Sequence, residues 1–264
     1  MKFIACGKTD IGVKRTKNED YFCSDEALGL FIVADGIGGH AGGEIASTMA
    51  VEVIRDYMKM TMGGKEQGAG EEKAQFTEET NRVAAAIQRA NQSIYESSQK
   101  DATLRGMGTT IAVALITGNK LSIAHVGDSR IYLVREHALF PLTDDHSVVS
   151  EQMKLGLITK EEAETSHIGN VITRALGYEE TVAMDLNELD IIEGDRIVLC
   201  TDGLTRMVSD DFILSTVSSV DKHEEACTIL IDTACANGGK DNITVIVIHI
   251  LQDGWLSRLK KYFR

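Results

Sequence analysis

The sequence predicts an α+β domain in which antiparallel strands are layered with helices. Runs rich in Val, Ile and Leu recur along the chain, and each closes at Gly, Asp or Asn. Several neighbouring runs are separated by only a few residues, and such short connections imply antiparallel pairing. Long helical stretches stand between groups of strands, so a wound βαβ sheet is not expected.

The strand runs have the composition of buried β-structure. They include residues 30–34, 110–117, 121–126, 130–135, 196–200 and 243–251. Short turns follow two of them, GNK at residues 118–120 and GDS at residues 127–129. We therefore expect antiparallel pairing across each of these two turns.

Helical periodicity predicts two long helices, at residues 44–60 and 77–100, and a third near residues 224–236. Thr77 supplies a polar start for the second helix. The residues expected to face inward are Val83, Ile87, Ala90 and Ile94 in the second helix, and Ala226, Ile229, Leu230 and Ala234 in the third.

Two segments are expected to stand apart from the sheets. Residues 147–177 mix helix and loop signals between strands. Residues 252–264 place apolar side chains opposite basic ones, as in a short basic amphipathic helix, although packing on the domain or fraying is the favoured explanation, because so few residues anchor weakly. We therefore expect one domain over residues 1–251, followed by this tail.

Composition limits the classes of function. A net charge of −13 argues against nucleic acid as the main partner, and a solvated acidic surface explains most of that charge. Five cysteines without a CxxC pair are typical of reduced thiols. We find no signal-peptide pattern and no apolar run long enough for a membrane span, so we expect a cytoplasmic protein.

Aspartates stand where apolar runs meet turns. These residues are Asp35, Asp128, Asp202 and Asp241, and a fifth, Asp20, closes the polar run RTKNED just before Tyr21 and Phe22. One Asp-Gly pair alone usually marks only a turn. If several carboxylates meet in one cleft, cations must balance their repulsion, because unpaired buried charge is costly. Oxygen ligands select Mg²⁺ or Mn²⁺ over zinc, and a pair of such ions activates water for in-line attack on phosphorus.

The chain resembles the protein phosphatase 2C family, particularly its bacterial single-domain members. Eight motifs occur in the family's order between about residues 6 and 250: RTKNEDYF, VADGIGGHAGGE, GMGTT, HVGDSR, LTDDHS, NVITRALG, CTDGL and GGKDNITVIV. The resemblance implies a sandwich of two antiparallel β-sheets flanked by helices. It also implies a two-metal site at one end, with residues 147–177 as a flap near that active site.

The resemblance assigns roles to individual residues. Asp35 would bridge two Mg²⁺ or Mn²⁺ ions, with the Gly36 carbonyl on one of them. Asp202 and Asp241 would hold the other ion, and Asp20 would bind one ion directly or through water. Glu19 would stand outside these ligands.

Two further groups would act on the substrate. Arg15 would clamp its phosphate, a task that suits a guanidinium. His40 would protonate the leaving alkoxide, with a structural role in its glycine-rich turn or a water at the metal site as alternatives.

A third ion is expected to bind weakly. In the family, the position of Asp128 helps to bind such an ion, and many relatives carry an aspartate where this chain has Arg206. An inward-pointing arginine would repel another cation.

The resemblance thus implies hydrolysis of phosphoserine and phosphothreonine in proteins. The alternatives are a catalytically inactive binding module and a phosphatase dedicated to one partner-switching regulator. We expect a monomer that opposes a bacterial serine/threonine kinase. Motifs typical of haloacid-dehalogenase phosphatases, P-loop enzymes and tyrosine phosphatases are missing from the sequence.

Overall fold

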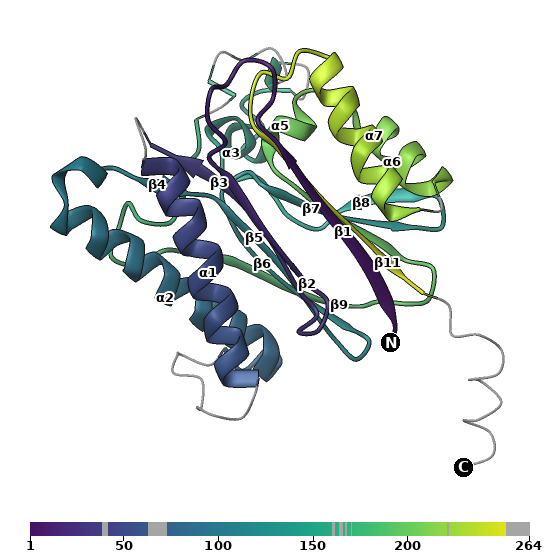
Figure 1. Ribbon diagram of the computed structural model, residues 1–264, viewed down its shortest axis with the longest axis horizontal. Coiled ribbons are helices and arrows are strands. Elements are labelled where there is room, and N and C mark those ends of the chain that lie inside the picture. Colours follow the sequence, from purple (N-terminus) through teal and green to yellow (C-terminus); the bar gives the residue numbers. More distant parts are fainter. Residues whose placement is uncertain are drawn as a thin grey trace.

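Two antiparallel β-sheets packed face to face form the centre of the molecule, and helices cover the outer face of each (Figure 1). The computed structural model describes residues 1–38, 42–62, 73–159, 162–163, 166, 168–169, 171–220 and 222–251. The predicted α+β sandwich is confirmed.

Within these residues, one sheet contains five strands. Their order is β1 (Phe3–Asp10), β11 (Ile243–Ile250), β10 (Arg196–Cys200), β7 (Arg130–Arg135) and β8 (Ala138–Pro141). Strand β11, which pairs with a neighbour on each side, is buried along its whole length, because its even-numbered residues face the other sheet and its odd-numbered residues face helices. A strand buried on both faces reads as one continuous apolar run, which explains why it is visible in the sequence.

The second sheet has six strands among the described residues. Its path is β2 (Asp20–Asp25), β3 (Leu30–Ile37), β5 (Ile111–Thr117), β6 (Lys120–Val126) and β9 (Asp185–Asp190), and β4 (Gly108–Thr109) pairs with β3 beside this path. The GNK turn joins β5 to β6 with Thr117 opposite Lys120, which confirms the antiparallel pairing expected there.

Two long helices, α1 (Gly42–Met62) and α2 (Glu78–Lys100), cover the second sheet. The short 3₁₀ turn η1 (Ala102–Leu104) follows them. The side chain of Thr77 accepts a hydrogen bond from the Thr80 amide, so the predicted helix start is confirmed. The four residues predicted to face inward on α2 are fully buried.

Helices α6 (Asp210–Ser219) and α7 (His223–Ala236) cover the first sheet together with the short helix α5 (Asp202–Thr205) (Figure 1). Of the residues predicted to face inward on α7, Ala226, Leu230 and Ala234 are fully buried and Ile229 is partly buried. The molecule therefore has four layers, in the order helices, sheet, sheet, helices.

The second short turn behaves differently from the prediction. We expected residues 121–126 and 130–135 to pair across the GDS turn, and this is wrong, because β6 pairs with β5 and β9 whereas β7 pairs with β10 and β8. Gly127 adopts a φ of 106° and packs against Thr110. That conformation, which few side-chain-bearing residues adopt, takes the chain out of one sheet and into the other.

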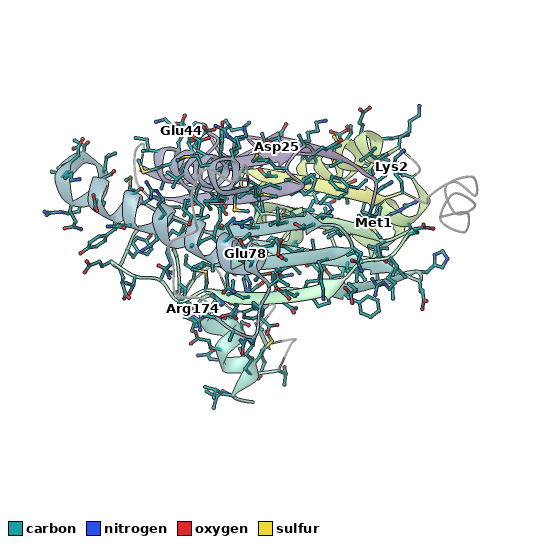
Figure 2. All side chains as sticks on the ribbon, turned by 90° about the horizontal axis from the view of Figure 1, so that it is seen from below. Met1, Lys2, Asp25, Glu44, Glu78 and Arg174 are labelled. Atoms are coloured by element: carbon teal, nitrogen blue, oxygen red, sulfur yellow. The ribbon has the colours of Figure 1, made fainter. Side chains whose placement is uncertain are left out.

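The segment 147–177 lies outside the main sheets, as predicted, and its described part contains α3 (Val148–Lys154). In Figure 2 this part projects from the layered body, and Arg174 lies near the point where it rejoins the body. The predicted tail at residues 252–264 lies outside the described residues. In the described part of the chain, no helix has both the length and the apolar content needed to cross a lipid bilayer.

Ile246 lies between the two sheets with 0% exposure, so Ile246→Ala should lower the free energy of unfolding by about 2–5 kcal/mol. The matched change Ile192→Ala removes a side chain that is 49% exposed and should alter stability by less than about 0.5 kcal/mol. Urea denaturation measures both. Equal losses for the two variants would contradict this account of the core.

Candidate active site

The five aspartates singled out in the sequence come from strand ends at one end of the sandwich. Asp20 begins β2 and stands opposite Asp35 of β3 in the sheet register. Asp128 lies in the turn that crosses between the sheets, Asp202 follows β10, and Asp241 precedes β11. The charges of the other four all act on Asp35, so the fold gathers these carboxyls into one cluster.

Burial and mutual repulsion make this cluster hard to ionise. Burial, followed by the charges of the neighbouring aspartates, raises the pKa of Asp35 well above its ordinary value. Burial raises the pKa of Asp20 to about 7, against hydrogen bonds that lower it. Burial and the charge of Asp202 raise the pKa of Asp128 to about 7 as well. Protons or cations must therefore neutralise the cluster near pH 7.

Asp20 is held by two buried hydroxyls. Its Oδ2 accepts hydrogen bonds from Thr201 Oγ1 at 2.8 Å and from Thr244 Oγ1 at 2.7 Å. Its Oδ1 is buried and has no hydrogen-bond partner among the described residues. The two hydroxyls therefore fix the carboxylate in one orientation and leave one of its oxygens available for another ligand.

Asp202 presents a second such oxygen. Its Oδ1 is also buried without a hydrogen-bond partner in the described part of the chain. A buried carboxylate oxygen left unpaired is costly, and divalent cations bound at the cluster would offset that cost for this atom and for Oδ1 of Asp20. Since the donors here are carboxylate oxygens, the residues fit hard ions such as Mg²⁺ and Mn²⁺.

Glycine is required beside two of the aspartates. A Cβ atom at Gly36 would lie 2.2 Å from the Gly43 carbonyl oxygen and 2.6 Å from that of Glu19. A Cβ atom at Gly203 would lie 1.9 Å from the carbonyl oxygen of Asn242. The Asp-Gly pairs therefore allow backbones from separate parts of the chain to meet at the cluster.

Arg15 reaches the cluster from the loop between β1 and β2. Its Nη2 lies 2.7 Å from Oδ2 of Asp241, and its side chain is 47% exposed. Asn242 holds this loop, since its Nδ2 donates to the carbonyls of Ile11 and Lys17 at 2.9 Å each. The loop that carries Arg15 is thus held in place, while the guanidinium of Arg15 is accessible to solvent.

Arg206 points into the cluster. Its Nη2 forms an ion pair with Oδ2 of Asp202 and lies 3.5 Å from Oδ2 of Asp128. The side chain projects from the end of α5, one helical turn after Asp202. A permanent positive charge therefore stands between two of the carboxylates.

The sequence analysis missed part of this site. It did not identify Thr201, Thr244 and Asn242, although each lies within three residues of a singled-out aspartate. His40 falls outside the described residues, so its role stays a prediction. Glu19 contributes its carbonyl oxygen, which accepts from the Gly36 amide at 3.1 Å and from the Ser47 hydroxyl at 2.6 Å.

Comparison with known proteins gives a consistent result. The family model described as Protein phosphatase 2C matches residues 8–235. The serine/threonine phosphatase stp of Listeria monocytogenes serotype 4b is 37% identical over 244 residues, which cover 91% of this chain and 93% of that protein.

Solved structures agree with the sequence relatives. The serine/threonine phosphatase of S. agalactiae superposes with a TM-score of 0.83 at 36% identity, covering 94% of this chain and 100% of that one. The catalytic domain of the serine/threonine protein phosphatase PstP, solved with two manganese ions, gives a TM-score of 0.79 at 33% identity, covering 95% of this chain and 99% of that one.

The metal-free protein should lose stability as pH rises from about 4 to about 7. Asp20 and Asp128 bind a proton more tightly when folded, with pKa values of about 7 against an ordinary 3.8, so the stability linked to that proton disappears across this interval. Thermal melting in chelator should therefore give a lower Tm at about pH 8 than at about pH 5.

Two controls accompany this measurement. Mn²⁺ should raise the Tm at the higher pH by mass action, and Asp20→Asn should make the pH dependence in chelator shallower, with the contribution of Asp128 remaining. A Tm in chelator that rises steadily over the interval would contradict the buried carboxylate cluster.

Proposed function

The chain belongs to the protein phosphatase 2C family and is a protein-serine/threonine phosphatase that depends on divalent metal, and we propose that its aspartate cluster holds two Mg²⁺ or Mn²⁺ ions. The observation that carries the proposal is the pair of buried, unpartnered oxygens, Oδ1 of Asp20 and Oδ1 of Asp202. Enzyme activity is thus favoured over an inactive binding module.

We assign the ligands by position. Asp35 would be shared by the two ions and the Gly36 carbonyl would contribute to one of them, while Asp202 and Asp241 would hold the other and Asp20 would contribute directly or through water. Support comes from the register that sets Asp20 opposite Asp35 and from the repulsion among the carboxyls, which cations relieve. When bound, two such ions lower the pKa of water, supplying a nucleophile for attack on phosphorus at neutral pH.

Two side chains, Arg15 and His40, are proposed to act on the substrate. We propose that Arg15 turns from Asp241 to bind the phosphate oxygens, because its guanidinium is exposed and its loop is fixed by Asn242. His40 remains the proposed proton donor to the leaving serine or threonine oxygen, with water as the alternative.

Arg206 is proposed to weaken any third ion. Its guanidinium pairs with both Asp128 and Asp202, the two carboxylates that a further ion would need. A bound cation there would have to displace the arginine or tolerate its charge.

In the cell, we propose that this phosphatase acts as a monomer in the cytoplasm and reverses phosphorylation by a serine/threonine kinase. The alternative is a single dedicated substrate of the partner-switching type. A phosphoproteome of a deletion strain separates the two, since the first predicts increased phosphorylation of many proteins and the second of one regulator.

Asp35→Asn should lower Mn²⁺-dependent hydrolysis of p-nitrophenyl phosphate at least about 100-fold, because a neutral amide cannot bridge two cations. Asp190→Asn, which alters an exposed carboxylate of β9 paired with Lys120, is the matched control and should retain activity. Undiminished turnover of Asp35→Asn, or of the wild type after exhaustive chelation, would refute the metal assignment.

Arg206→Asp should create an additional cation site. Removing the guanidinium and adding a carboxylate next to Asp128 and Asp202 would provide ligands for a further ion. Calorimetric titration with Mn²⁺ should show two tight sites in the wild type and an added one in the variant. A tight third site in the wild type would contradict the role given to Arg206.

A further inference from the structure

The loop that precedes α3 is anchored residue by residue. The carbonyl oxygen of Asp144 accepts from His125 Nε2 at 2.8 Å. The Asp145 carboxylate receives two parallel bonds from Arg130, at 2.8 and 2.7 Å. Such a bidentate pair fixes both position and direction. The next residue, His146, is therefore held in a defined place beside the metal-site turn.

His146 contacts that turn through one ring nitrogen. Its Nδ1 accepts a hydrogen bond from the Gly127 amide at 3.1 Å, and its own amide donates to the Gly127 carbonyl at 2.9 Å. Because an amide N–H can only donate, Nδ1 carries no proton, and in the neutral ring the proton lies on Nε2. Burial, with a further contribution from His125, lowers the pKa of His146 and favours this neutral form.

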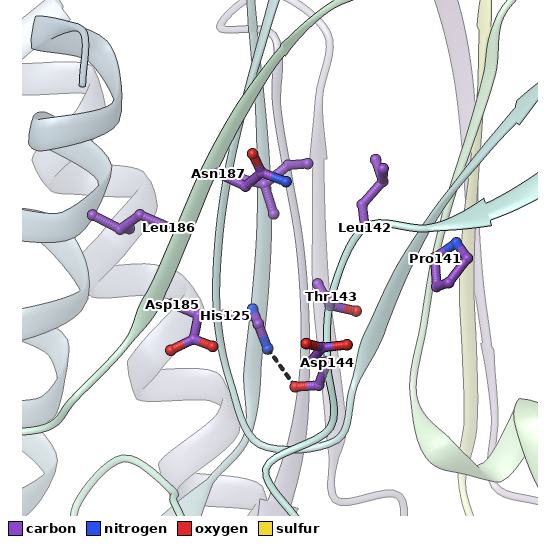
Figure 3. Close-up of a pocket in the computed structure, with 9 residues that line it drawn as sticks. His125, Pro141, Leu142, Thr143, Asp144, Asp185, Leu186 and Asn187 are labelled. Atoms are coloured by element: carbon purple, nitrogen blue, oxygen red, sulfur yellow. Dashed lines mark hydrogen bonds between the residues drawn. The ribbon is translucent and has the colours of Figure 1, made fainter. Parts of the chain in front are cut away.

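The other ring nitrogen faces a carboxylate. Nε2 of His146 lies 3.3 Å from Oδ2 of Asp185, at the edge of a cleft of about 310 Å³. In Figure 3 the side chains of Asp185 and His125 lie side by side at this edge. His146 is 4% exposed, so its ring connects the turn to Asp185 from a buried position.

These groups do not form a second metal centre. Ligand atoms of His125, His146 and Asp185 lie within 4.8 Å of one another. However, Nε2 of His146 carries the proton, and Nη1 of Arg174 lies 3.1 Å from Asp185 and 3.3 Å from that nitrogen. A guanidinium therefore takes the place that a cation would need.

Both ends of the segment 147–177 meet at His146. The Thr173 amide donates to the His146 carbonyl at 2.8 Å, and the Val148 amide donates to the Val171 carbonyl at 2.9 Å. Ser147 pairs with Ile172 in an isolated antiparallel bridge, and Arg174 follows one residue after Thr173. Both ends of the projecting segment are thus joined to a residue that also binds the turn containing Asp128.

We propose that His146 is a positioning residue that links the metal-site turn at Gly127 and Asp128 to both ends of the segment 147–177, through opposite nitrogens of one neutral imidazole. The link holds the turn in place for catalysis and the segment in place against a protein substrate. The inference rests on the proposed function, because it assigns the turn to the metal site.

Two substitutions separate the two contacts. In His146→Asn the amide oxygen can replace Nδ1 as the acceptor for Gly127, whereas the contact with Asp185 is lost. In His146→Gln the longer amide can still donate to Asp185, whereas Gly127 loses its acceptor. Steady-state kinetics on a phosphothreonine peptide should show that kcat of the Gln variant falls about tenfold below that of the Asn variant, the scale of one lost buried hydrogen bond.

The segment contact is tested separately. His146→Asn and Asp185→Asn should both raise KM for the phosphopeptide, and both should speed hydrogen exchange in α3. Asp185 is 49% exposed, so this variant should fold even if substitutions of the buried histidine do not. Asn187→Ala, on the same face of β9, is the control and should leave kcat and KM unchanged.

The outcomes are distinct. If the His146 variants lower only the Tm and leave kcat and KM of the folded enzyme unchanged, or if Asp185→Asn leaves KM and exchange unchanged, the positioning role is refuted. Mn²⁺-dependent turnover of p-nitrophenyl phosphate by the wild type tests the proposed function on its own, so the two failures can be told apart.

Discussion

Repulsion among buried carboxylates is the constraint on which the rest of the structure depends. Asp20, Asp35, Asp128 and Asp202 have raised pKa values because burial and their mutual charges oppose ionisation. No single chain segment could hold so many like charges together. The carboxylates come from strands of both sheets, and the apolar interface between the sheets holds the ends of these strands together against the repulsion. The stability of the sandwich thus maintains a local arrangement that is unfavourable until cations neutralise it.

The geometry of the sandwich explains how distant residues meet. Antiparallel strands present both beginnings and ends at one edge, so Asp20 and Asp241 approach at strand beginnings while Asp35 and Asp202 arrive at strand ends. The crossing at Gly127 adds Asp128 between the sheets. Around these ligands, neutral groups such as Thr201 and Thr244 fix orientation without adding charge.

The sequence predicted the parts of the fold that are buried on both faces, because continuous apolar runs are unambiguous there. It missed the strands at the sheet edges, β1, β2, β8 and β9, of which β1, β2 and β9 mix polar with apolar residues and β8 is only four residues long. The pairing error at the GDS turn arose because turn length alone does not show that a chain changes sheets. At the site, motif order indicated the aspartates and the arginine at position 206, whose inward direction only the structure shows. The hydroxyl and amide groups that hold them were not predicted, because their contacts join residues about 180 or more positions apart.

Arg206 has a consequence for how the enzyme responds to its surroundings. The occupancy of a site by a dissociable ion depends on the free concentration of that ion. A guanidinium attached to the chain is present at every ion concentration. The positive charge shared by Asp128 and Asp202 is therefore insensitive to swings in cellular divalent-metal supply. A substitution to arginine can in this way replace a bound metal ion as the source of positive charge at this point of the site.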